Sequence, residues 1–282
     1  MNLSTLKQKY FTELQKEYTP EKIELVFQSL SKKYFMGKSE LQNRLVSNVV
    51  QEKFEEVLQK LKANHPVEYI LGEAEFYGRN FKISPAVHVP RPETETMVEW
   101  VLRDFRDRAK KEELSLLDIG TGSGVLPISL HKEMPEVEVM AMDISEEALS
   151  IARENASRLK ASVKFLKADL FALDDLPRKF DIIVSNPPYI LKEAQKDVQR
   201  KILKYEPPIA LYVEDSDPMI FNRKIAQLAQ RSLKPKGAVY LEINQYLKPQ
   251  TEKLFHELGF KSTCRRDVFG NPRTIKALKS ED

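Results

Sequence analysis

The spacing of apolar residues divides the chain into two parts. In the first part, apolar side chains recur three or four positions apart with charged residues between them, as at Ile23, Val26, Phe27 and Leu30. This spacing places the apolar side chains on one face of a helix. We therefore predict a small all-α bundle over residues 1–70.

Short, continuous apolar runs replace that spacing in the second part. Five of them cover residues 114–119, 137–143, 163–169, 180–185 and 237–243, and two more strands are expected near residues 260–264 and 274–278. Such runs, alternating with helical stretches, are typical of strands that are covered on both faces of a mostly parallel sheet. The pattern predicts an α/β domain of Rossmann-like, seven-stranded architecture.

Composition and charge exclude some classes of protein. With 282 residues, 41% hydrophobic content and 9 glycines, the chain has the make-up of a folded protein of two domains. Its 45 basic and 42 acidic residues nearly balance, so charge gives no reason to expect a nucleic-acid partner. The single cysteine, Cys264, rules out an internal disulfide and is consistent with a reducing compartment. Because no apolar signal segment or membrane-length apolar run is visible, we expect a cytoplasmic protein without a membrane partner.

The strongest chemical signal follows the apolar run 180–185, in Asn186, Pro187, Pro188 and Tyr189. In open α/β sheets, the carboxyl ends of the strands border the ligand site. The Asn186 side-chain carbonyl and the Pro187 backbone carbonyl could each accept one N–H proton of a planar amide or amine. Pro188 would hold the turn rigid, and Tyr189 would cover the flat group with its ring. The same residues also fit a simple strand-ending turn.

A second signal is the glycine-rich loop after the run 114–119, which consists of Gly120, Thr121, Gly122, Ser123 and Gly124. Glycines allow the backbone to approach a ligand closely, and the helix that follows offers free N–H groups. A dinucleotide fingerprint would need its third glycine at position 125, where Val125 stands. The loop therefore favours a nucleotide-type cofactor other than NAD.

Two acidic residues end the next two apolar runs. Asp143 lies where ribose hydroxyls bind in this architecture, although it could instead cap the helix that is expected to begin near Ser145. Ser145 could serve as that cap as well. Asp169 could accept a hydrogen bond from the exocyclic amine of adenine, with Leu170 against the ring. A helix cap or a solvated turn explains Asp169 equally well.

Glycines, two acids and Asn-Pro-Pro-Tyr thus follow successive predicted strands. This order resembles that of the class I S-adenosylmethionine-dependent methyltransferases over about residues 90–282. The resemblance implies that S-adenosyl-L-methionine is bound, and S-adenosyl-L-homocysteine released, by the glycine loop with Asp143, Asp169, Leu170 and Asn186. It also implies an antiparallel end to the sheet. The planar nitrogens methylated in this class include adenine N6, guanine N2 and the N5 of protein glutamine.

Two further segments narrow the choice. Residues 88–95 read His-Val-Pro-Arg-Pro-Glu-Thr-Glu and residues 205–211 read Tyr-Glu-Pro-Pro-Ile-Ala-Leu, and both are similar to segments of the release-factor glutamine-N5 methyltransferases. That family implies a helical domain at 1–70 that recognises the substrate protein, a β-hairpin connector at 71–90 and a methyltransferase domain at 91–282. The substrate would be the glutamine of the Gly-Gly-Gln motif in class I peptide-chain release factors.

Some positions depart from the family or have a second explanation. Residues 213–218 and Asn244 stand where the family commonly has glycine-rich sequence, although Asn244 can adopt a left-handed backbone. The prolines and acids of residues 91–95 suit a helix N-terminus, while the resemblance implies that Thr94 and Glu95 also help to close over the cofactor. The helical domain could serve stability alone instead of docking a partner.

The implied reaction is direct, in-line transfer of a methyl group to the glutamine nitrogen, with Asn186, Pro187 and Tyr189 as catalytic residues. Alignment and exclusion of water would supply the rate enhancement, and Asp181, inside its strand, is expected to be structural. The 4 histidines are too scattered for a metal site, and no nucleophile motif is present. The alternatives are methylation of a nucleic-acid amino group or of a ribosomal-protein glutamine, and, from a different class, nicotinamide-dependent oxidoreduction.

Overall fold

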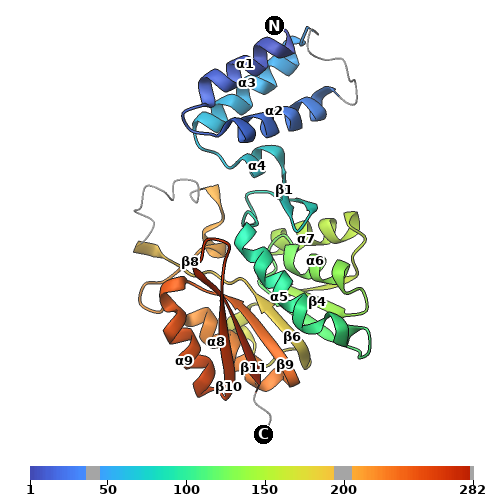
Figure 1. Cartoon of the computed structure of the whole chain (residues 1–282), viewed down its shortest axis with the longest axis vertical. Coiled ribbons are helices and arrows are strands. Elements are labelled where there is room, and N and C mark those ends of the chain that lie inside the picture. The colour runs from blue at the N-terminus through green and yellow to red at the C-terminus, as the bar shows by residue number, and fades with distance from the viewer. Residues whose placement is uncertain (36–44, 194–204, 280–282) are drawn as a thin grey trace. The chain divides into compact units, whose positions relative to one another are not determined.

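The computed structural model describes residues 1–35, 45–193 and 205–279, and the chain divides into two compact units. The first unit contains Met1–Glu73 and Gln199–Tyr205, and the second contains Ala74–Val198 and Glu206–Asp282. Figure 1 follows both units along the chain. All of the candidate site residues belong to the second unit.

The described part of the first unit is built from helices, as its apolar spacing predicts. They are α1 (Leu3–Leu14), α2 (Pro20–Phe35), α3 (Asn48–Lys62) and the short α4 (Val67–Leu71). The rings of Tyr10, Phe27 and Phe54 pack edge to face, with centroids 5.4, 5.9 and 5.3 Å apart. Aromatic pairs of this geometry add to the gain from apolar burial, so the bundle has a hydrophobic core of its own.

A two-stranded hairpin follows the helices. Strands β1 (Glu73–Phe76) and β2 (Arg79–Lys82) are joined by Tyr77 and Gly78, whose φ angles are 48° and 67°. Two consecutive left-handed residues form the tight turn that matches the twist of paired strands. Phe76 and Phe81 are buried in a core of the second unit, so the hairpin packs as part of that unit.

The second unit is organised around a seven-stranded sheet in the order β10-β11-β9-β6-β3-β4-β5. Its strands are β3 (Ser115–Ile119), β4 (Glu138–Asp143), β5 (Val163–Lys167), β6 (Phe180–Ser185), β9 (Leu233–Glu242), β10 (Phe260–Arg266) and β11 (Pro272–Lys279). Strand β11 runs antiparallel to both of its neighbours, and the other pairings are parallel. The predicted Rossmann-like architecture and its antiparallel end are therefore confirmed.

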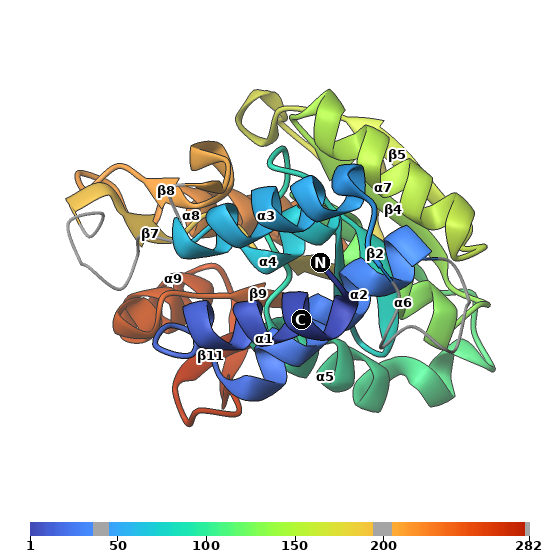
Figure 2. The same cartoon turned by 90° about the horizontal axis from the view of Figure 1, so that it is seen from above.

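Alternate residues of the central strands face two separate cores. Along β6, Ile182 and Val184 belong to the core on the side of three helices, α5 (Pro92–Ala109), α6 (Val125–Glu133) and α7 (Glu146–Arg158). Ile183 belongs to the core that contains side chains of α8 (Ile220–Ser232) and α9 (Lys248–Glu257). Figures 1 and 2 show the two helix groups on opposite sides of the sheet. Burial on both faces explains the continuous apolar runs in the sequence.

Short elements complete the end of the sheet where the central parallel strands finish. They are the single-turn helices η1 (Leu170–Ala172), η4 (Pro208–Ala210) and η5 (Gln245–Leu247), and the two-residue strands β7 (Ile190–Leu191) and β8 (Tyr212–Val213), which pair with each other. Each of them follows a strand or a motif that the sequence marks as chemically important. The loops that border the carboxyl ends of the strands are thus held by local structure.

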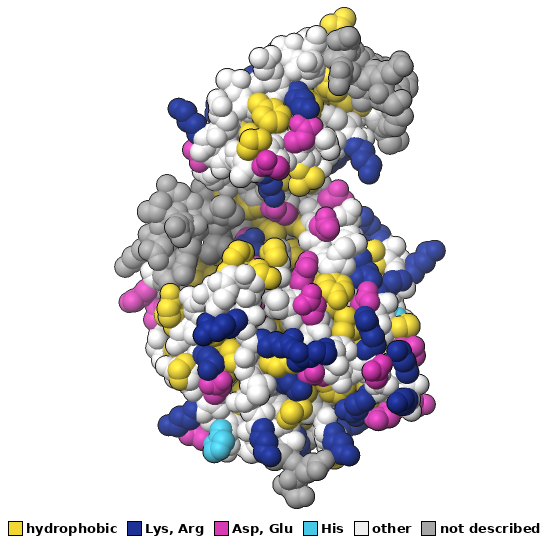
Figure 3. Space-filling model, viewed as in Figure 1, with side chains coloured by type: hydrophobic (Ala, Val, Ile, Leu, Met, Phe, Trp, Pro, Cys, Tyr) yellow, Lys and Arg dark blue, Asp and Glu magenta, His cyan; other side chains and the backbone are white. Residues whose placement is uncertain are grey.

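The visible surface of the second unit carries charges of both signs. In Figure 3, lysine and arginine side chains are interspersed with aspartate and glutamate. Some form ion pairs, such as Arg79 with Glu133 at 2.6 Å and Lys164 with Glu138 at 2.7 Å. Exposed pairs contribute only about 0.2–1 kcal/mol each, so the apolar cores decide the fold.

Candidate active site

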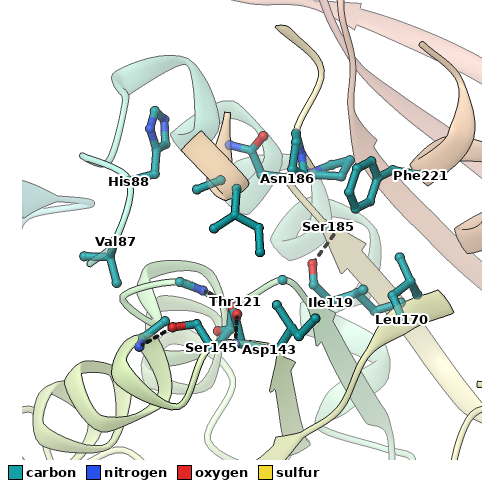
Figure 4. A pocket seen from close by; sticks show the side chains of 18 of the residues that line it. Val87, His88, Ile119, Thr121, Asp143, Ser145, Leu170, Ser185, Asn186 and Phe221 are labelled. Atoms are coloured by element: carbon teal, nitrogen blue, oxygen red, sulfur yellow. Dashed lines mark hydrogen bonds between the residues drawn. The ribbon is translucent and has the colours of Figure 1, made fainter. Parts of the chain in front are cut away.

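A cavity of about 370 Å³ opens at the carboxyl ends of β3, β4 and β6. In Figure 4, Asn186 and Phe221 lie on one side of it, and Thr121, Asp143 and Ser145 lie on the other. Of the candidate residues predicted from the sequence, the cavity is lined by Gly120, Thr121, Gly122, Ser123, Asp143, Asp169, Leu170, Asn186, Pro187, Pro188 and Tyr189. The fold therefore brings together motifs from four different strand ends. Thr94 lines it as well, whereas Gly124 and Glu95 do not, and the Glu95 carboxylate accepts from the Tyr77 N–H at 2.8 Å.

The glycine loop has a left-handed backbone at three positions. The φ angles are 75° at Gly120, 55° at Gly122 and 81° at Gly124, a region that side chains with a Cβ rarely adopt. The N–H groups of Gly120 and Thr121 both donate to the carbonyl of Met142, which holds the loop against the end of β4. The loop is thereby fixed before any ligand arrives.

Gly124 serves packing between helices. A Cβ added there would lie 2.9 Å from Ile128 Cδ1 and 3.1 Å from Ala152 Cβ, closer than unstrained carbon contacts. Gly124 also directly precedes α6, as its N-cap residue. Its place in the motif thus reflects the close approach of α6 and α7. The four preceding loop residues line the cavity, and their contact with the cofactor stays a prediction.

Asp143 ties the second strand end to the glycine loop. Its Oδ2 accepts a hydrogen bond from the Gly122 N–H at 2.9 Å, and its Oδ1 accepts one from the Ser145 N–H at 2.9 Å. The N-cap of α7 is Ser145, whose hydroxyl accepts from the Ala148 N–H at 3.2 Å. Ser145, and not Asp143, is therefore the cap of α7, and Asp143 lines the cavity.

Asp169 both caps a short helix and lines the cavity. Its Oδ1 accepts from the Phe171 N–H at 2.9 Å and caps η1, as the alternative explanation proposed. Asp169 and the following Leu170 also line the cavity. A carboxylate has more acceptor sites than one cap consumes, so capping leaves room for a ligand contact.

The Asn-Pro-Pro-Tyr corner is fixed at both ends. The Ser185 hydroxyl donates to the Ile119 carbonyl at 2.7 Å, which locks the end of β6 to the end of β3 (Figure 4). At the other end, the Asn244 side-chain amide donates to the Tyr189 carbonyl at 3.1 Å. Asn244 has a φ of −65°, so it does not use the left-handed backbone that its place in the family pattern allows. It uses its side chain to hold the corner instead.

A buried polar network lies behind the corner. Asn186 Nδ2 donates to Thr94 Oγ1 at 3.3 Å, and the Thr94 hydroxyl donates to Glu242 Oε2 at 2.8 Å. The Tyr189 hydroxyl donates to Glu242 Oε1 at 3.0 Å, and Arg273 Nη1 lies 3.4 Å from that hydroxyl. Burial and the Glu242 charge raise the pKa of Tyr189, so its hydroxyl remains a donor. Tyr189 is thus anchored by its hydroxyl while it lines the cavity.

Glu206 joins the two segments that carry the family resemblance. Its carboxylate is fully buried, is ion-paired with Arg91, lies against His88 Nδ1 and accepts from the Val89 N–H at 3.0 Å. Burial alone would raise the pKa of Glu206, but His88, Arg91 and the Val89 N–H outweigh it and hold the pKa below its usual value. Residues from both segments line the cavity.

Asp118 is a buried acid in β3, two residues before the first glycine of the loop. Neither carboxylate oxygen has a hydrogen-bond partner among the described residues, and burial raises the pKa of Asp118 to about 7. By contrast, Asp181 accepts from the N–H and the hydroxyl of Ser115 and from Lys234 Nζ, each at 2.8 Å. That arrangement supports the structural role expected for Asp181.

The sequence alone gave no site role to Asp118, Glu206, Glu242 or Arg273, although Glu206, Glu242 and Arg273 lie in segments that match the family. A weak signal existed for Asp118 and Glu242, because an acid inside or at the end of an apolar run is unusual unless it is paired or functional. Arg91, the ion-pair partner of Glu206, and Tyr189, which Arg273 approaches, lie far away in the sequence, and periodicity carries no information about them.

The sheet and the cavity at its carboxyl edge define a class I methyltransferase. A family model described as a methyltransferase domain matches residues 110–268. A methyltransferase structure from Pyrococcus furiosus shares the fold, with a TM-score of 0.53 and 19% identity over 83% of this chain and 100% of that one.

Two curated relatives narrow the class. The release factor glutamine methyltransferase of Flavobacterium psychrophilum is 42% identical over 82% of this chain and 81% of its own length. That of Bacteroides thetaiotaomicron is 40% identical over 86% of this chain and 85% of its own length. The chain therefore belongs to the release factor glutamine methyltransferase family, and not to the nicotinamide-dependent oxidoreductases.

Among residues 1–35, 45–193 and 205–279, no helix has the length and apolar character needed to cross a membrane. Within the same ranges, no three or more His, Cys, Asp and Glu side chains are grouped so that they could hold a metal ion.

Proposed function

We propose that this chain transfers a methyl group from S-adenosyl-L-methionine to the side-chain nitrogen, N5, of the glutamine in the Gly-Gly-Gln motif of class I peptide-chain release factors. The observation that carries the proposal is the Asn-Pro-Pro-Tyr corner at the wall of the cavity, in a chain whose relatives are named for release factor glutamine methylation. A primary carboxamide has two N–H protons, and the corner supplies two carbonyl acceptors for them.

The cavity wall fits the cofactor in several respects. The left-handed glycines expose backbone to a ligand, and Asp143 offers a carboxylate for ribose hydroxyls. Asp169 and Leu170 offer an acceptor and an apolar face for adenine. When bound, S-adenosyl-L-methionine supplies a methyl group activated by the adjoining sulfonium.

The residues of the corner act by positioning the substrate. The Asn186 side-chain carbonyl and the Pro187 backbone carbonyl accept the two amide N–H groups, which turns one face of the nitrogen toward the methyl donor. Both acceptors favour the positive charge that develops on the nitrogen. Pro188 keeps the Pro187 carbonyl in a fixed direction, and the Tyr189 ring covers the amide and excludes water. After the transfer, the methylated nitrogen loses one proton and the neutral amide is restored.

The helical bundle is proposed to dock the release factor, in the domain arrangement 1–70, 71–90 and 91–282. Its own aromatic core makes it an independently packed module, a property that suits a recognition domain. Because release factors act in translation, the proposal places the protein in the cytoplasm. Nucleic acid is not a partner in this proposal.

The test supplies purified protein with methyl-labelled S-adenosyl-L-methionine and, in parallel, a class I release factor, the same factor with its Gly-Gly-Gln glutamine replaced by alanine, a ribosomal-protein mixture and total RNA. Label on the intact factor alone, mapped by mass spectrometry to the glutamine side chain, is the expected result. Label on RNA would support a nucleic-acid amino-group methyltransferase. Label on a ribosomal protein would support the ribosomal-protein alternative, and either outcome would overturn the proposal.

A further inference from the structure

Glu242 occupies an unusual position behind the substrate corner. It ends β9, is 1% exposed, and accepts hydrogen bonds from the hydroxyls of Thr94 and Tyr189, which line the cavity. Thr94 in turn receives the Nδ2 group of Asn186. The proposed reaction needs Asn186 and Tyr189, but it does not by itself give Glu242 or Thr94 a role.

The Glu242 carboxylate sets the direction of the hydrogen bonds that connect it to Thr94 and Asn186. An ionised carboxylate can only accept, so the single proton of the Thr94 hydroxyl is directed to Glu242 at 2.8 Å. The Thr94 oxygen then has only lone pairs to offer to Asn186. Of the two ends of the Asn186 amide, only the NH₂ group can face such an acceptor, and it does so at 3.3 Å. An amide can otherwise be turned over at almost no steric cost, because its O and N ends have similar size.

The opposite end of the amide is left for a ligand. Fixing Nδ2 against Thr94 turns Oδ1 the other way, and no residue that the structure describes donates a hydrogen bond to Asn186 Oδ1. Asn186 lines the cavity, so a carbonyl oxygen is the polar group that it can present there. The turned-over amide would present NH₂ to the substrate NH₂, and two donors repel.

The hydrogen bonds at Glu242 are those of an ionised carboxylate, while its burial opposes the charge. Burial raises the pKa of Glu242 above its usual value, against the opposing effects of the Thr94 hydroxyl, the Arg273 charge, the Tyr189 hydroxyl and His88. The geometry supplies two hydroxyl donors and no competing acceptor, which is an arrangement suited to a carboxylate.

We propose that Glu242, acting through Thr94, fixes the Asn186 side chain with its carbonyl toward the substrate and so makes the site selective for N–H donors. Glu242 and Thr94 are positioning residues in this scheme. The inference rests on the proposed function, because it explains how the glutamine amide is distinguished from a group with no N–H. The selectivity for N–H donors then originates in the direction of the buried hydrogen bonds from Asn186 to Thr94 and from Thr94 to Glu242.

The test compares Thr94→Val, which removes the hydroxyl at nearly constant volume, with the matched control Thr94→Ser, which keeps it. A second variant, Glu242→Gln, keeps the shape but adds a donor that frees the Thr94 hydroxyl to turn toward Asn186 Oδ1. For Thr94→Val and Glu242→Gln, kcat with release factor should fall about tenfold or more, since a lost orienting hydrogen bond is worth about one decade. The KM for the factor and the Kd for S-adenosyl-L-methionine should stay within about twofold, and Thr94→Ser should retain kcat within about threefold.

A double-mutant cycle shows whether Thr94 acts through Asn186. In an Asn186→Ala background, Thr94→Val should have little further effect in single-turnover assays with labelled cofactor, because there is no amide left to orient. An equal loss in both backgrounds, or a Thr94→Ser variant as impaired as Thr94→Val, would overturn the inference. Cofactor titration of each variant shows that the domain is folded. Failure of the proposed function would appear differently, as a native chain that does not methylate the factor at all.

Discussion

Arg91 is ion-paired with the buried carboxylate of Glu206, which lies 115 residues later in the chain. The same carboxylate accepts the Val89 N–H and lies against His88. The segment before α5 is therefore bound to the segment that follows the substrate corner. Both contribute to the cavity wall, so this ion pair holds together two sides of the candidate site.

Replacing Glu206 by glutamine should lower the free energy of unfolding of the second unit by about 3–5 kcal/mol, because it breaks a buried ion pair and leaves the Arg91 charge without its partner. The pKa of Glu206 is lowered in the folded chain. Its stabilising contribution is therefore present above the pKa of the unfolded carboxyl and is lost as pH falls through the folded pKa. Urea denaturation at neutral and acidic pH measures both effects.

The matched control for Glu206 is Glu138→Gln, since Glu138 also pairs with two cations but is 43% exposed. Its loss should be below about 1 kcal/mol. If the two variants were equally destabilised at neutral pH, or if the Glu206 difference did not narrow in acid, the structural role of the Arg91 pair would be wrong.

Asn186→Ala should leave the Kd for S-adenosyl-L-methionine within a few-fold and lower kcat by at least about 10²-fold, the scale for loss of a group that stabilises the transition state. Isothermal titration and a methylation assay with release factor separate the two quantities. Near-normal turnover in this variant would remove Asn186 from the catalytic residues.

Asp143→Ala should chiefly weaken cofactor binding, by about 1–3 kcal/mol, because it removes a carboxylate from the cavity wall and releases the Gly122 N–H that it holds. Glu146→Gln is the control, since Glu146 is an acid in the first turn of α7 that does not line the cavity. Isothermal titration should show little change for the control. Equal affinities for the two variants would leave Asp143 with only a structural role in the loop.

Gly124→Ala should destabilise the second unit more than Gly259→Ala. Both glycines have a φ of 81° and pay about 1–2 kcal/mol for a left-handed alanine, but an added Cβ at Gly259 meets nothing within 4 Å. At Gly124 it would press on Ile128 and Ala152, which should cost about 1–3 kcal/mol more. Thermal unfolding measured for both variants tests this, and equal shifts in Tm would show that α6 and α7 are not closely packed there.

Asp118→Asn should change the pH dependence of stability in the absence of cofactor. Because burial raises the folded pKa of Asp118 to about 7, its contribution is fully present below the unfolded pKa of about 4 and is lost as pH rises through about 7. The variant should therefore gain stability over the native chain at pH 8, by up to about 4 kcal/mol, and lose that advantage as the pH falls to about 4. Asp107→Asn, at a residue whose side chain is 91% exposed, is the control for urea denaturation across this range. A difference that is constant with pH would contradict the raised pKa.

Much of the fold could be predicted because its signals are local. Residues 180–185 are all apolar except Asp181 and Ser185. Strand β6 has the predicted bounds, Phe180–Ser185. The strand ends then fix which motifs share an edge, since parallel strands finish on the same side of a sheet. The neighbourhood of the glycine loop, Asp143 and the Asn-Pro-Pro-Tyr corner followed from that rule alone.

Other features depend on contacts that periodicity does not record. Gly124 looks like a ligand-binding glycine in the sequence, but its environment is set by Ala152 on another helix. The hydrogen-bond partner of Asn186 could not be read from the sequence either, because Thr94 lies 92 residues before it. A residue's nearest neighbours in space are decided by how helices and strands pack.

The sequence by itself determined the sheet, its two-sided burial and the edge at which the chemistry gathers, because a strand or helix imprints its period on consecutive residues. Only the tertiary structure decided that Glu242, 148 residues after Thr94, stands behind the substrate corner and directs its hydrogen bonds. Hydrogen-bond direction depends on which donors and acceptors meet in a dry interior. That meeting is a property of the packed chain, and no local pattern of residues encodes it.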